Sequence, residues 1–230
     1  MALRRVLADL VQGDRAYAEG PRAHHLARVA RLEVGEQVEV SDTSRVWTAT
    51  VESVSGEEVV FLLGDAADQQ DEGPTIELHL AVIKFPRFEL AVEKATELGV
   101  ETIVPVAAGR SDRGLVRAAV KRAQRWQRVA EEAAQQSRRL AAPEITEPIS
   151  FTEALNRPAD VRLLLDLEGE PLGPAAKDQR TVLLIGPEGG WTDDERKQAA
   201  EAGASGVRLG VTVLRAETAA IAAVAIARTG

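Results

Sequence analysis

Residues 64–74, GDAADQQDEGP, divide the sequence into two parts whose apolar residues follow different periods. The stretch is acidic and rich in turn-forming residues, which is typical of a linker. Before it, runs at residues 37–41, 46–54 and 58–63 alternate as half-buried strands do. Short strands at this spacing predict a small barrel or sandwich. We therefore predict two domains, residues 1–70 and 75–230, with a short helix at residues 21–32 in the first.

In the second part, predicted strands alternate with predicted helices. The runs at residues 161–165 and 182–185 are apolar enough to be parallel strands buried on both faces. This alternation is typical of an α/β domain with a mainly parallel sheet. The expected strands lie at residues 75–83, 102–106, 161–165, 182–185 and 207–209, and the expected helices at residues 86–98, 115–140, 192–202 and 216–228.

The composition excludes several classes of protein. The chain has no cysteine, which excludes disulfide frameworks, cysteine-ligated zinc and thiol nucleophiles. No apolar run approaches the roughly 18 residues of a transmembrane helix, and the N-terminus lacks the apolar region of a secretory signal. We therefore expect a soluble cytoplasmic protein that binds no membrane and needs no metal.

Charge is distributed unevenly along the chain. The formal net charge is -8, yet residues 1–32 carry six arginines against three acidic residues. Residues 110–139 carry nine basic residues against three acidic ones, and Arg117, Lys121 and Arg125 recur at helical spacing. A protein that is acidic overall can still hold a polyanion on such local surfaces. The alternative is that both stretches are solvated faces without a partner.

Residues 183–192, LLIGPEGGWT, combine a buried strand, a glycine-rich turn and a helix that begins after Thr192. In open α/β sheets, ligands bind at the carboxyl ends of strands, and glycines let the backbone approach a ligand closely. The spacing fits neither the dinucleotide nor the triphosphate glycine motif, and three acidic residues in the first helical turn disfavour phosphate. A ligand-binding turn and an ordinary strand-to-helix turn both fit.

Residues 209–219, LGVTVLRAETA, repeat this arrangement. A predicted strand again ends at a glycine, and a loop leads to a helix. Arg215 and Glu217 are the charged residues next to a helix that is apolar nearly all round. The alternative to a functional role is an ordinary helix start, with Glu217 near the positive end of the helix dipole.

These two segments, together with blocks elsewhere, are similar to one known family. The blocks include residues 25–32 (HLARVARL), Lys84, residues 93–100 (EKATELGV), Arg110 and residues 125–126 (RW). The chain resembles the SPOUT superfamily of S-adenosylmethionine-dependent RNA methyltransferases. Within that superfamily it is similar to the RsmE family, which methylates ring N3 of a uridine in small-subunit (16S) ribosomal RNA.

The resemblance implies a PUA-like, RNA-binding β-barrel at residues 1–70 and a SPOUT methyltransferase domain at residues 75–230. It implies a deep trefoil knot that threads the chain from about residue 160 to the end. It also implies S-adenosyl-L-methionine as the cofactor, ribosomal RNA of the small subunit or the subunit itself as substrate, and a homodimer. The sequence departs from the family at Thr212, where an arginine is common, at Phe85-Pro86 and at Gly109.

The resemblance also implies which residues bind the cofactor and the RNA. The cofactor is expected in three loops, at residues 165–169, 185–191 and 209–214, mainly on backbone groups. The expected cofactor-binding residues are Leu165, Asp166, Ile185, Gly186, Pro187, Glu188, Gly189, Gly190, Trp191, Leu209, Gly210, Val213 and Leu214. The expected RNA-binding residues are Arg4, Arg5, Arg22, Arg28, Arg31, Lys84, Arg110, Arg113, Arg117, Lys121 and Arg125.

Catalysis at ring N3 requires loss of its proton, because protonated N3 is a poor nucleophile. No histidine lies in the expected site, so we expect Arg215 to stabilise the uridine anion. Glu217 and Glu188 are the nearby carboxylates, and each either acts as a base or shapes the pocket. Alternatively, Arg215 pairs with Glu188 or Glu217 and only holds the loop in shape. Ribose 2′-O methylation and RNA binding without catalysis are the competing functions.

Overall fold

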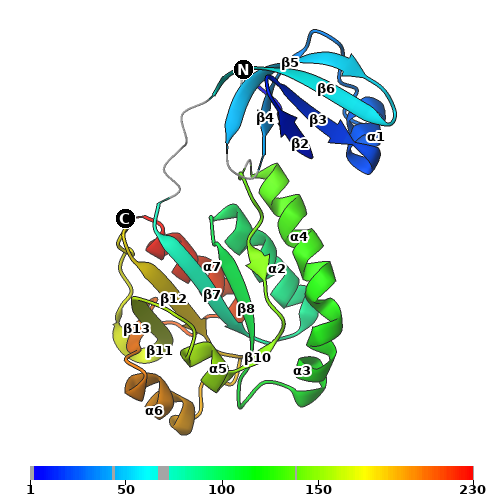
Figure 1. The fold of residues 1–230 in the computed structure, drawn as a ribbon. Helices are drawn as coiled ribbons and strands as arrows, with labels where there is room; N and C mark the ends of the chain where they lie inside the picture. Colours follow the sequence, from blue (N-terminus) through cyan, green and yellow to red (C-terminus); the bar gives the residue numbers. More distant parts are fainter. Residues whose placement is uncertain (1–2, 43–44, 67–72, 138, 230) are drawn as a thin grey trace. The chain divides into compact units, whose positions relative to one another are not determined.

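The computed structural model describes residues 3–42, 45–66, 73–137 and 139–229. The chain divides into two units, residues 1–71 with 135–141 and residues 72–134 with 142–230. Figure 1 shows the strands and helices of each unit. No helix within the described ranges is long and apolar enough to cross a membrane.

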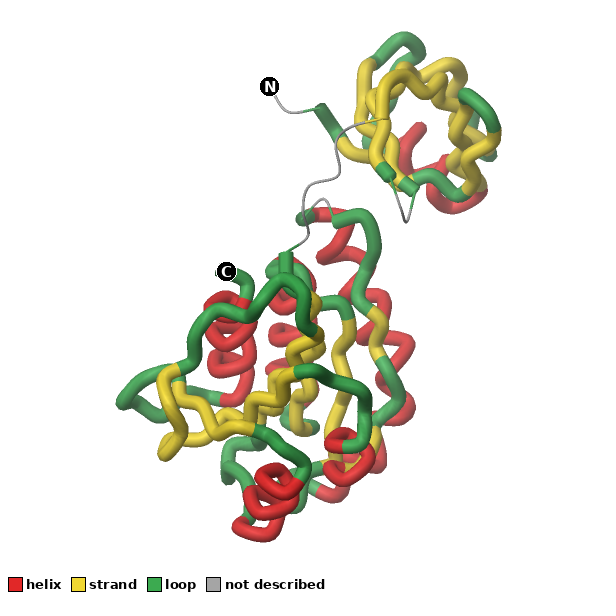
Figure 2. The backbone as a smooth tube through the Cα atoms, turned by 60° about the vertical axis from the view of Figure 1, so that its left-hand side comes forward, coloured by secondary structure: helices red, strands yellow, loops and turns green. Residues whose placement is uncertain are grey.

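The first unit is a curled sheet with a helix against it (Figure 2). Its elements are β1 (Arg5–Leu7), β2 (Leu10–Gln12), β3 (Arg15–Glu19), α1 (Gly20–Arg28), β4 (Gln37–Ser41), β5 (Val46–Val54) and β6 (Glu58–Ala66). The strand order is β1-β4-β5-β6-β3-β2, with β1 parallel to β4 and the other neighbours antiparallel. Alternate side chains, such as Ala16 and Ala18 in β3, fill the core.

The predicted strands at residues 37–41 and 46–54 are confirmed, and the third runs on to Ala66. The part of the expected linker at residues 67–72 lies outside the described residues. The sequence reading missed β1, β2 and β3, because strands of three to five residues carry too few positions to show a period. They form by pairing with each other and with β4 and β6, which lie far along the chain.

The helix predicted at residues 21–32 ends earlier, at Arg28. Arg31 adopts a left-handed backbone with a φ of 52°, which no α-helix accommodates. Val29, expected in the apolar stripe, is 67% exposed. The stripe expected from periodicity was therefore wrong at its C-terminal end.

The second unit is built on a parallel sheet. Its strands are β7 (Thr75–Ala81), β8 (Thr102–Ala107), β9 (Glu144–Ile145), β10 (Ile149–Ser150), β11 (Val161–Pro171), β12 (Arg180–Ile185) and β13 (Ser205–Arg208). The order is β10-β8-β7-β12-β11-β13, with β9 paired to β8, and every recorded pairing is parallel. The predicted α/β architecture is confirmed.

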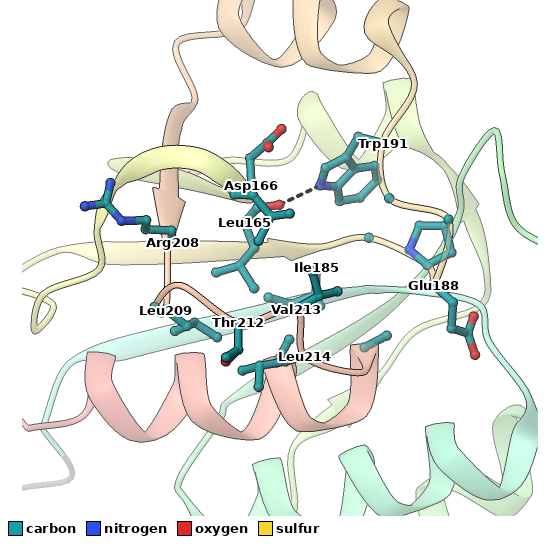
Figure 3. Close-up of a pocket in the computed structure, with 18 of the residues that line it drawn as sticks. Leu165, Asp166, Ile185, Glu188, Trp191, Arg208, Leu209, Thr212, Val213 and Leu214 are labelled. Carbon is teal, nitrogen blue, oxygen red and sulfur yellow. Dashed lines mark hydrogen bonds between the residues drawn. The ribbon is translucent and has the colours of Figure 1, made fainter.

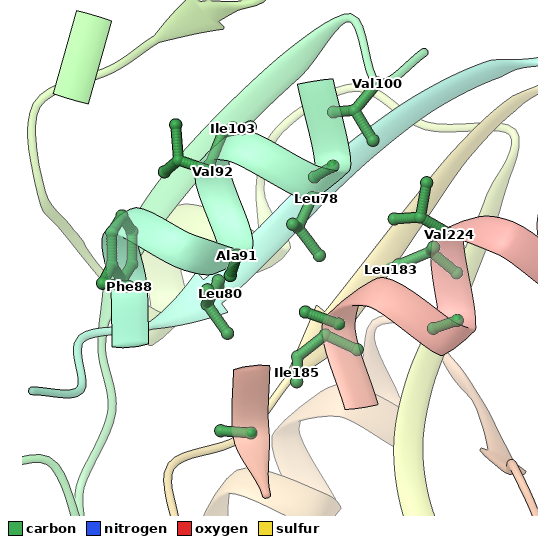
Figure 4. Packing of buried hydrophobic residues seen from close by; sticks show 14 of the residues in the cluster. Leu78, Leu80, Phe88, Ala91, Val92, Val100, Ile103, Leu183, Ile185 and Val224 are labelled. Carbon is green, nitrogen blue, oxygen red and sulfur yellow. The ribbon is translucent and has the colours of Figure 1, made fainter. Parts of the chain in front are cut away.

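Helices cover both faces of this sheet. They are α2 (Phe85–Glu97), α3 (Arg113–Ala119), α4 (Ala123–Gln136), α5 (Phe151–Leu155), α6 (Asp193–Glu201) and α7 (Ala216–Ala227). Helices α2 and α7 pack on one face, where Leu78, Leu183 and Val224 belong to the same core cluster (Figure 4). Phe151 and Trp191 pack on the other face, in the cluster that also holds Val104.

The single helix predicted at residues 115–140 is wrong. The structure has α3, a 3₁₀ turn at Val120–Arg122, and then α4, which ends at Gln136. A 3₁₀ turn of three residues differs from an α-helical turn by less than one residue per turn, so apolar periodicity does not detect it. Val120, expected on the apolar stripe, is 53% exposed.

Candidate functional site

A cavity of about 280 Å³ opens where β12 and β13 end and where β11 is irregular (Figure 3). All thirteen residues expected to bind the cofactor line it: Leu165, Asp166, Ile185, Gly186, Pro187, Glu188, Gly189, Gly190, Trp191, Leu209, Gly210, Val213 and Leu214. Leu167, Arg196, Arg208, Thr212, Ala216 and Ala219 complete the lining. The chain thus brings three distant segments together at the carboxyl edge of the sheet.

The first segment is an irregularity inside β11, where the sequence predicted a loop after the strand. The pairing of β11 with β13 shifts register between Leu165 and Glu170. Gly169 passes so close to the backbone of Val207 that a Cβ atom there would collide with it. Arg208 donates a hydrogen bond from Nη1 to the Gly169 carbonyl oxygen at 2.5 Å. Glycine at this position therefore permits the close approach that shapes one wall.

The second segment is the glycine-rich turn after β12. Gly190 has a φ of 69°, and its N–H donates to the carbonyl oxygen of Pro187 at 2.8 Å, which closes the turn. Trp191 directly follows this turn and is buried, and its Nε1 donates to the Leu165 carbonyl oxygen at 3.1 Å, as the dashed line in Figure 3 marks. A Cβ atom on Gly186 would lie 3.1 Å from the Trp191 ring. The indole thus contacts both the first segment, at Leu165, and the second segment, at Gly186.

Helix α6 follows this turn and begins with a capping box between Thr192 and Glu195, as the N-cap threonine predicted. Glu195 is buried, and its Oε1 also accepts a hydrogen bond from the Gly109 N–H at 2.7 Å. One carboxylate therefore holds the start of α6 and the end of β8 together. Glu195, the third of the acidic residues at this helix start, therefore serves the fold.

The third segment, residues 209–214, is an exposed apolar loop. Val211 is 99% exposed and Val213 is 78% exposed. Among the described residues, none accepts a hydrogen bond from the backbone N–H groups of residues 210–214. Apolar side chains of Leu165, Ile185 and Leu214 face the cavity, so it offers apolar walls with unused backbone donors at its edge. Such a site suits a ligand with a flat apolar ring and polar margins.

Glu217 at the start of α7 and Glu188 in the glycine-rich turn share a partner that the sequence did not predict. Arg87 in α2 donates from Nη1 to Glu188 Oε1 at 2.8 Å, and its Nε lies 3.6 Å from Glu217 Oε1. Glu217 is buried, and its Oε2 has no hydrogen-bond partner within the described residues. The only sequence signal was an arginine in the first helical turn after a strand end, three residues beyond Lys84.

Arg215 is exposed and precedes α7 as its N-cap residue. Its side chain forms no ion pair or hydrogen bond with the described residues, so the alternative expectation, that Arg215 pairs with Glu188 or Glu217, is wrong. Neither Arg215 nor Glu217 lines the cavity itself, although Leu214 and Ala216 do. Arg196 and Arg208 are further cations at the cavity, and Arg196 is tied to Asp166 at 2.5 Å.

The basic residues expected to bind RNA fall into two groups. Five are engaged within the fold: Arg4 with the Ala30 carbonyl, Arg5 with Glu39, Arg22 with Asp9, Arg110 with the Gly189 carbonyl and Arg125 with Glu89. Six are exposed and have no recorded ion pair among the described residues: Arg28, Arg31, Lys84, Arg113, Arg117 and Lys121. The contact from Arg110 supports the glycine-rich turn of the cavity.

Sequence families and known relatives match this arrangement. The model of the RNA methyltransferase domain matches residues 71–228, and the model of the RNA methyltransferase PUA domain matches residues 18–63. Ribosomal RNA small subunit methyltransferase E of Mycobacterium bovis is 33% identical over 222 residues, which cover 92% of this chain and 85% of the relative. The chain belongs to the ribosomal RNA small subunit methyltransferase E family.

Other members of the methyltransferase E family agree. The Synechocystis member is 32% identical over 213 residues, covering 88% of this chain and 69% of its own. The crystal structure of the Neisseria gonorrhoeae member, bound to S-adenosyl methionine, superimposes with a TM-score of 0.84 at 27% identity. That match covers 97% of this chain and 95% of the other. The resemblance and the PUA-plus-α/β fold are confirmed, and the chain is an RNA methyltransferase; the trefoil knot stays a prediction.

Proposed function

We propose that this methyltransferase uses S-adenosyl-L-methionine to methylate ring N3 of a uridine in 16S ribosomal RNA. The observation that carries the proposal is the cavity that residues 165–167, 185–191, 208–210 and 212–214 form together. Its apolar walls suit the adenine and the methionine chain, and the unused N–H groups of residues 210–214 suit the polar edges. When bound, the cofactor supplies an electrophilic methyl group.

The residues of the chain must then align N3 and stabilise its negative charge. The N3–H proton would pass to solvent, and the N3 anion would take the methyl group that the bound cofactor would supply, with the demethylated cofactor as the second product. Arg215 is an exposed cation that has no side-chain partner among the described residues, and it lies between two residues that line the cavity, so it can face a uridine placed at the opening. A cation there stabilises the anion most where charge develops in the reaction.

Glu217 has a different role in this proposal. Glu217 is buried against Arg87 and does not line the cavity, so its role is to position the start of α7. Contact with the substrate is assigned to Arg215. Glu188 is exposed at the cavity and bound to the same arginine. We propose that the pair of carboxylates holds Arg87, and through it the two loops, in register.

RNA is proposed to bind to the first unit and to the exposed basic residues of α3 and the following turn. Arg28 and Arg31 in the first unit, and Arg113, Arg117 and Lys121 in the second, are exposed and form no ion pair with the part of the chain that the structure describes. Such groups bind phosphate by displacing counterions. The substrate is accordingly small-subunit RNA or the small ribosomal subunit, in the cytoplasm.

A homodimer is proposed from the apolar loop over the cavity. The side chains of Leu167, Val211 and Val213 are 58%, 99% and 78% exposed. Large apolar side chains exposed beside a binding site are typical of a surface that another molecule covers. A second copy would cover them and exclude water from the reacting groups. Analytical ultracentrifugation at several concentrations tests this directly.

The function is tested by methylating isolated small-subunit RNA and intact small subunits with labelled cofactor. Digestion to nucleosides and mass analysis then identify the product. N3-methyluridine supports the proposal, a 2′-O-methylated nucleoside supports ribose methylation, and RNA binding without transfer supports a non-catalytic role. Calorimetry with the demethylated cofactor, run in parallel, shows whether the cavity is a binding site.

A further inference from the structure

A second cavity, of about 390 Å³, lies at the amino ends of β11 and β12, the edge of the sheet away from the proposed cofactor site. It is lined by residues 156–160 between α5 and β11, by Arg162 and by Arg180. Three of its residues are arginines. Neither the proposed reaction nor the expected RNA-binding residues use any of them.

The charges around this cavity do not balance. Arg157 Nε lies 3.3 Å from Oε2 of Glu77, and Arg180 Nη1 lies 3.5 Å from its Oε1. Glu77 is only 3% exposed, so these two cations neutralise a buried carboxylate. Asp160, which also lines the cavity, is the second carboxylate, and it accepts a hydrogen bond from the backbone N–H of Arg180 at 2.8 Å. Three guanidinium groups thus face two carboxylates.

His79 is the remaining titratable group that faces Glu77. Its Nε2 lies 3.3 Å from Glu77 Oε2, and burial lowers the pKa of His79 below its ordinary value. It is therefore neutral at pH 7 and leaves the charge count unchanged. The cavity keeps one excess positive charge.

Arg162 holds donors that the fold does not use. Its Nη2 donates to the Arg157 carbonyl oxygen at 2.6 Å, which orients the guanidinium. Its Nε is buried and has no hydrogen-bond partner among the described residues. A buried donor without a partner is costly, and a guanidinium fixed by one bond presents its other N–H groups in a set direction.

We propose that this cavity is an oxyanion site that binds a phosphate group through Arg157, Arg162 and Arg180. Guanidinium groups bind phosphate oxygens through paired, charge-assisted hydrogen bonds, and an anion would satisfy the excess charge and the unused donors together. The cavity is larger than a phosphate ion needs. It therefore has room for a phosphate carried by a larger molecule, either a phosphodiester of RNA or a free phosphorylated compound.

Thermal melting with inorganic phosphate and pyrophosphate, against sodium chloride of equal ionic strength, tests the site. Phosphate at about ten times its dissociation constant should raise the melting temperature of the wild type by about 3–6 °C. Arg45→Gln, which removes an exposed arginine from the first unit, should show the same shift. Arg162→Gln should lose most of the shift. Arg162 is the arginine to replace because Arg157 and Arg180 neutralise Glu77, so the buried carboxylate keeps both partners in this variant.

A full shift in Arg162→Gln would overturn the proposal. If that variant fails to fold, Arg162→Met keeps the length of the side chain without its charge or donors, and a full shift there overturns the proposal equally. Calorimetry should give the same cofactor affinity in every variant. The phosphate site and the proposed function are therefore tested separately, because the melting shift can be absent while cofactor binding is normal, and cofactor binding can be absent while the melting shift is present.

The two sources of phosphate are separated by RNA binding at several salt concentrations. If an RNA phosphodiester occupies the cavity, Arg162→Gln should lower the salt slope by slightly less than one, and pyrophosphate should compete with RNA. If a free compound occupies it, the variant should lose the phosphate shift and keep the slope of the wild type.

Discussion

Arg87 and Glu188 are 2.8 Å apart although they lie on different elements, one in the first turn of α2 and the other in the glycine-rich turn after β12. The same guanidinium lies 3.6 Å from Glu217, in the first turn of α7. The side chain of Glu217 is 8% exposed, whereas that of Glu188 is 44% exposed. Arg87 therefore neutralises one buried carboxylate and tethers one exposed loop.

Replacing Arg87 should weaken both the fold and cofactor binding. Arg87→Met leaves Glu217 buried without a counter-charge, which should cost about 1–3 kcal/mol of unfolding free energy. The exposed pair with Glu188 should add little to stability. Its loss should instead free the glycine-rich turn and weaken cofactor affinity, which calorimetry measures. Arg87→Lys is the matched control, and lower stability with unchanged affinity would limit Arg87 to a role in the fold.

Arg215→Ala should reduce the rate of methyl transfer and leave cofactor affinity unchanged. Arg215 has no internal partner in the described structure, so its removal disturbs no recorded contact of its side chain. The loss should be on the order of 10²–10³ in the single-turnover rate at saturating RNA, by analogy with removal of an oxyanion donor. Arg215→Lys should recover part of the rate. A normal rate in Arg215→Ala would refute the assignment.

Two substitutions at the cavity should separate binding from stability. A Cβ atom on Gly210 meets nothing within 4 Å, so Gly210→Val should fold normally and fill part of the cofactor site. Trp191 is 1% exposed, so Trp191→Ala should cost about 3–5 kcal/mol of unfolding free energy. Denaturant unfolding and calorimetry should therefore rank the two variants in opposite orders. Equal cofactor affinity in Gly210→Val and the wild type would place the cofactor elsewhere.

Stability should fall below pH 6.5 because of His79. Burial lowers the pKa of His79 from its ordinary 6.5, and the hydrogen bond to Glu77 only partly opposes this. As the pH falls below 6.5, the unfolded chain binds a proton that the folded chain does not. The unfolding free energy should then drop by up to about 1.4 kcal/mol per pH unit until the folded pKa is reached.

The variant His79→Gln keeps a donor beside Glu77 and removes the titration. Its stability should be nearly flat between pH 5 and 6.5, measured by urea unfolding. The pKa of Glu77 is itself lowered from 4.5, because the hydrogen bond from His79 and the charge of Arg157 outweigh the opposing effect of burial. Its contribution is therefore lost only below pH 4.5. The same slope in variant and wild type would exclude His79 as the cause.

RNA affinity should depend on the exposed basic residues of α3 and the turn that follows. Arg117→Glu with Lys121→Glu should weaken binding of small-subunit RNA and lower the salt slope by slightly less than one for each phosphate contact removed. The control is Arg45→Gln, in which an exposed arginine outside the expected surface is lost. An unchanged slope would make this surface a solvated face.

The amino-acid sequence alone determined the α/β class, the two glycine-containing turns and the family. Those features depend on short segments: apolar strands at residues 161–165 and 182–185, an N-cap at Thr192 and glycines where the backbone turns. The predicted burial on both faces is confirmed for residues 182–185 and wrong for residues 161–165, of which only Leu164 is buried. Local periodicity and turn chemistry act over a few residues, so they can be read from neighbours in the chain. The thirteen residues expected to bind the cofactor were identified in this way, with the help of the resemblance, and all of them line one cavity. The loop expected at residues 165–169 is instead an irregular part of β11.

Only the tertiary structure decided which charged groups meet. Arg87 and Glu188 are 101 positions apart, and Arg157 and Glu77 are 80 apart. Such pairs form because parallel strands bring their ends to a common edge, and no local pattern records which partner each charge will find. Strand β1 likewise forms only because its backbone pairs with β4, which no local pattern predicts. The close approach of Gly169 to Val207 also depends on two separate segments meeting. These contacts depend on distances between segments, and the chain acquires those distances only when it folds.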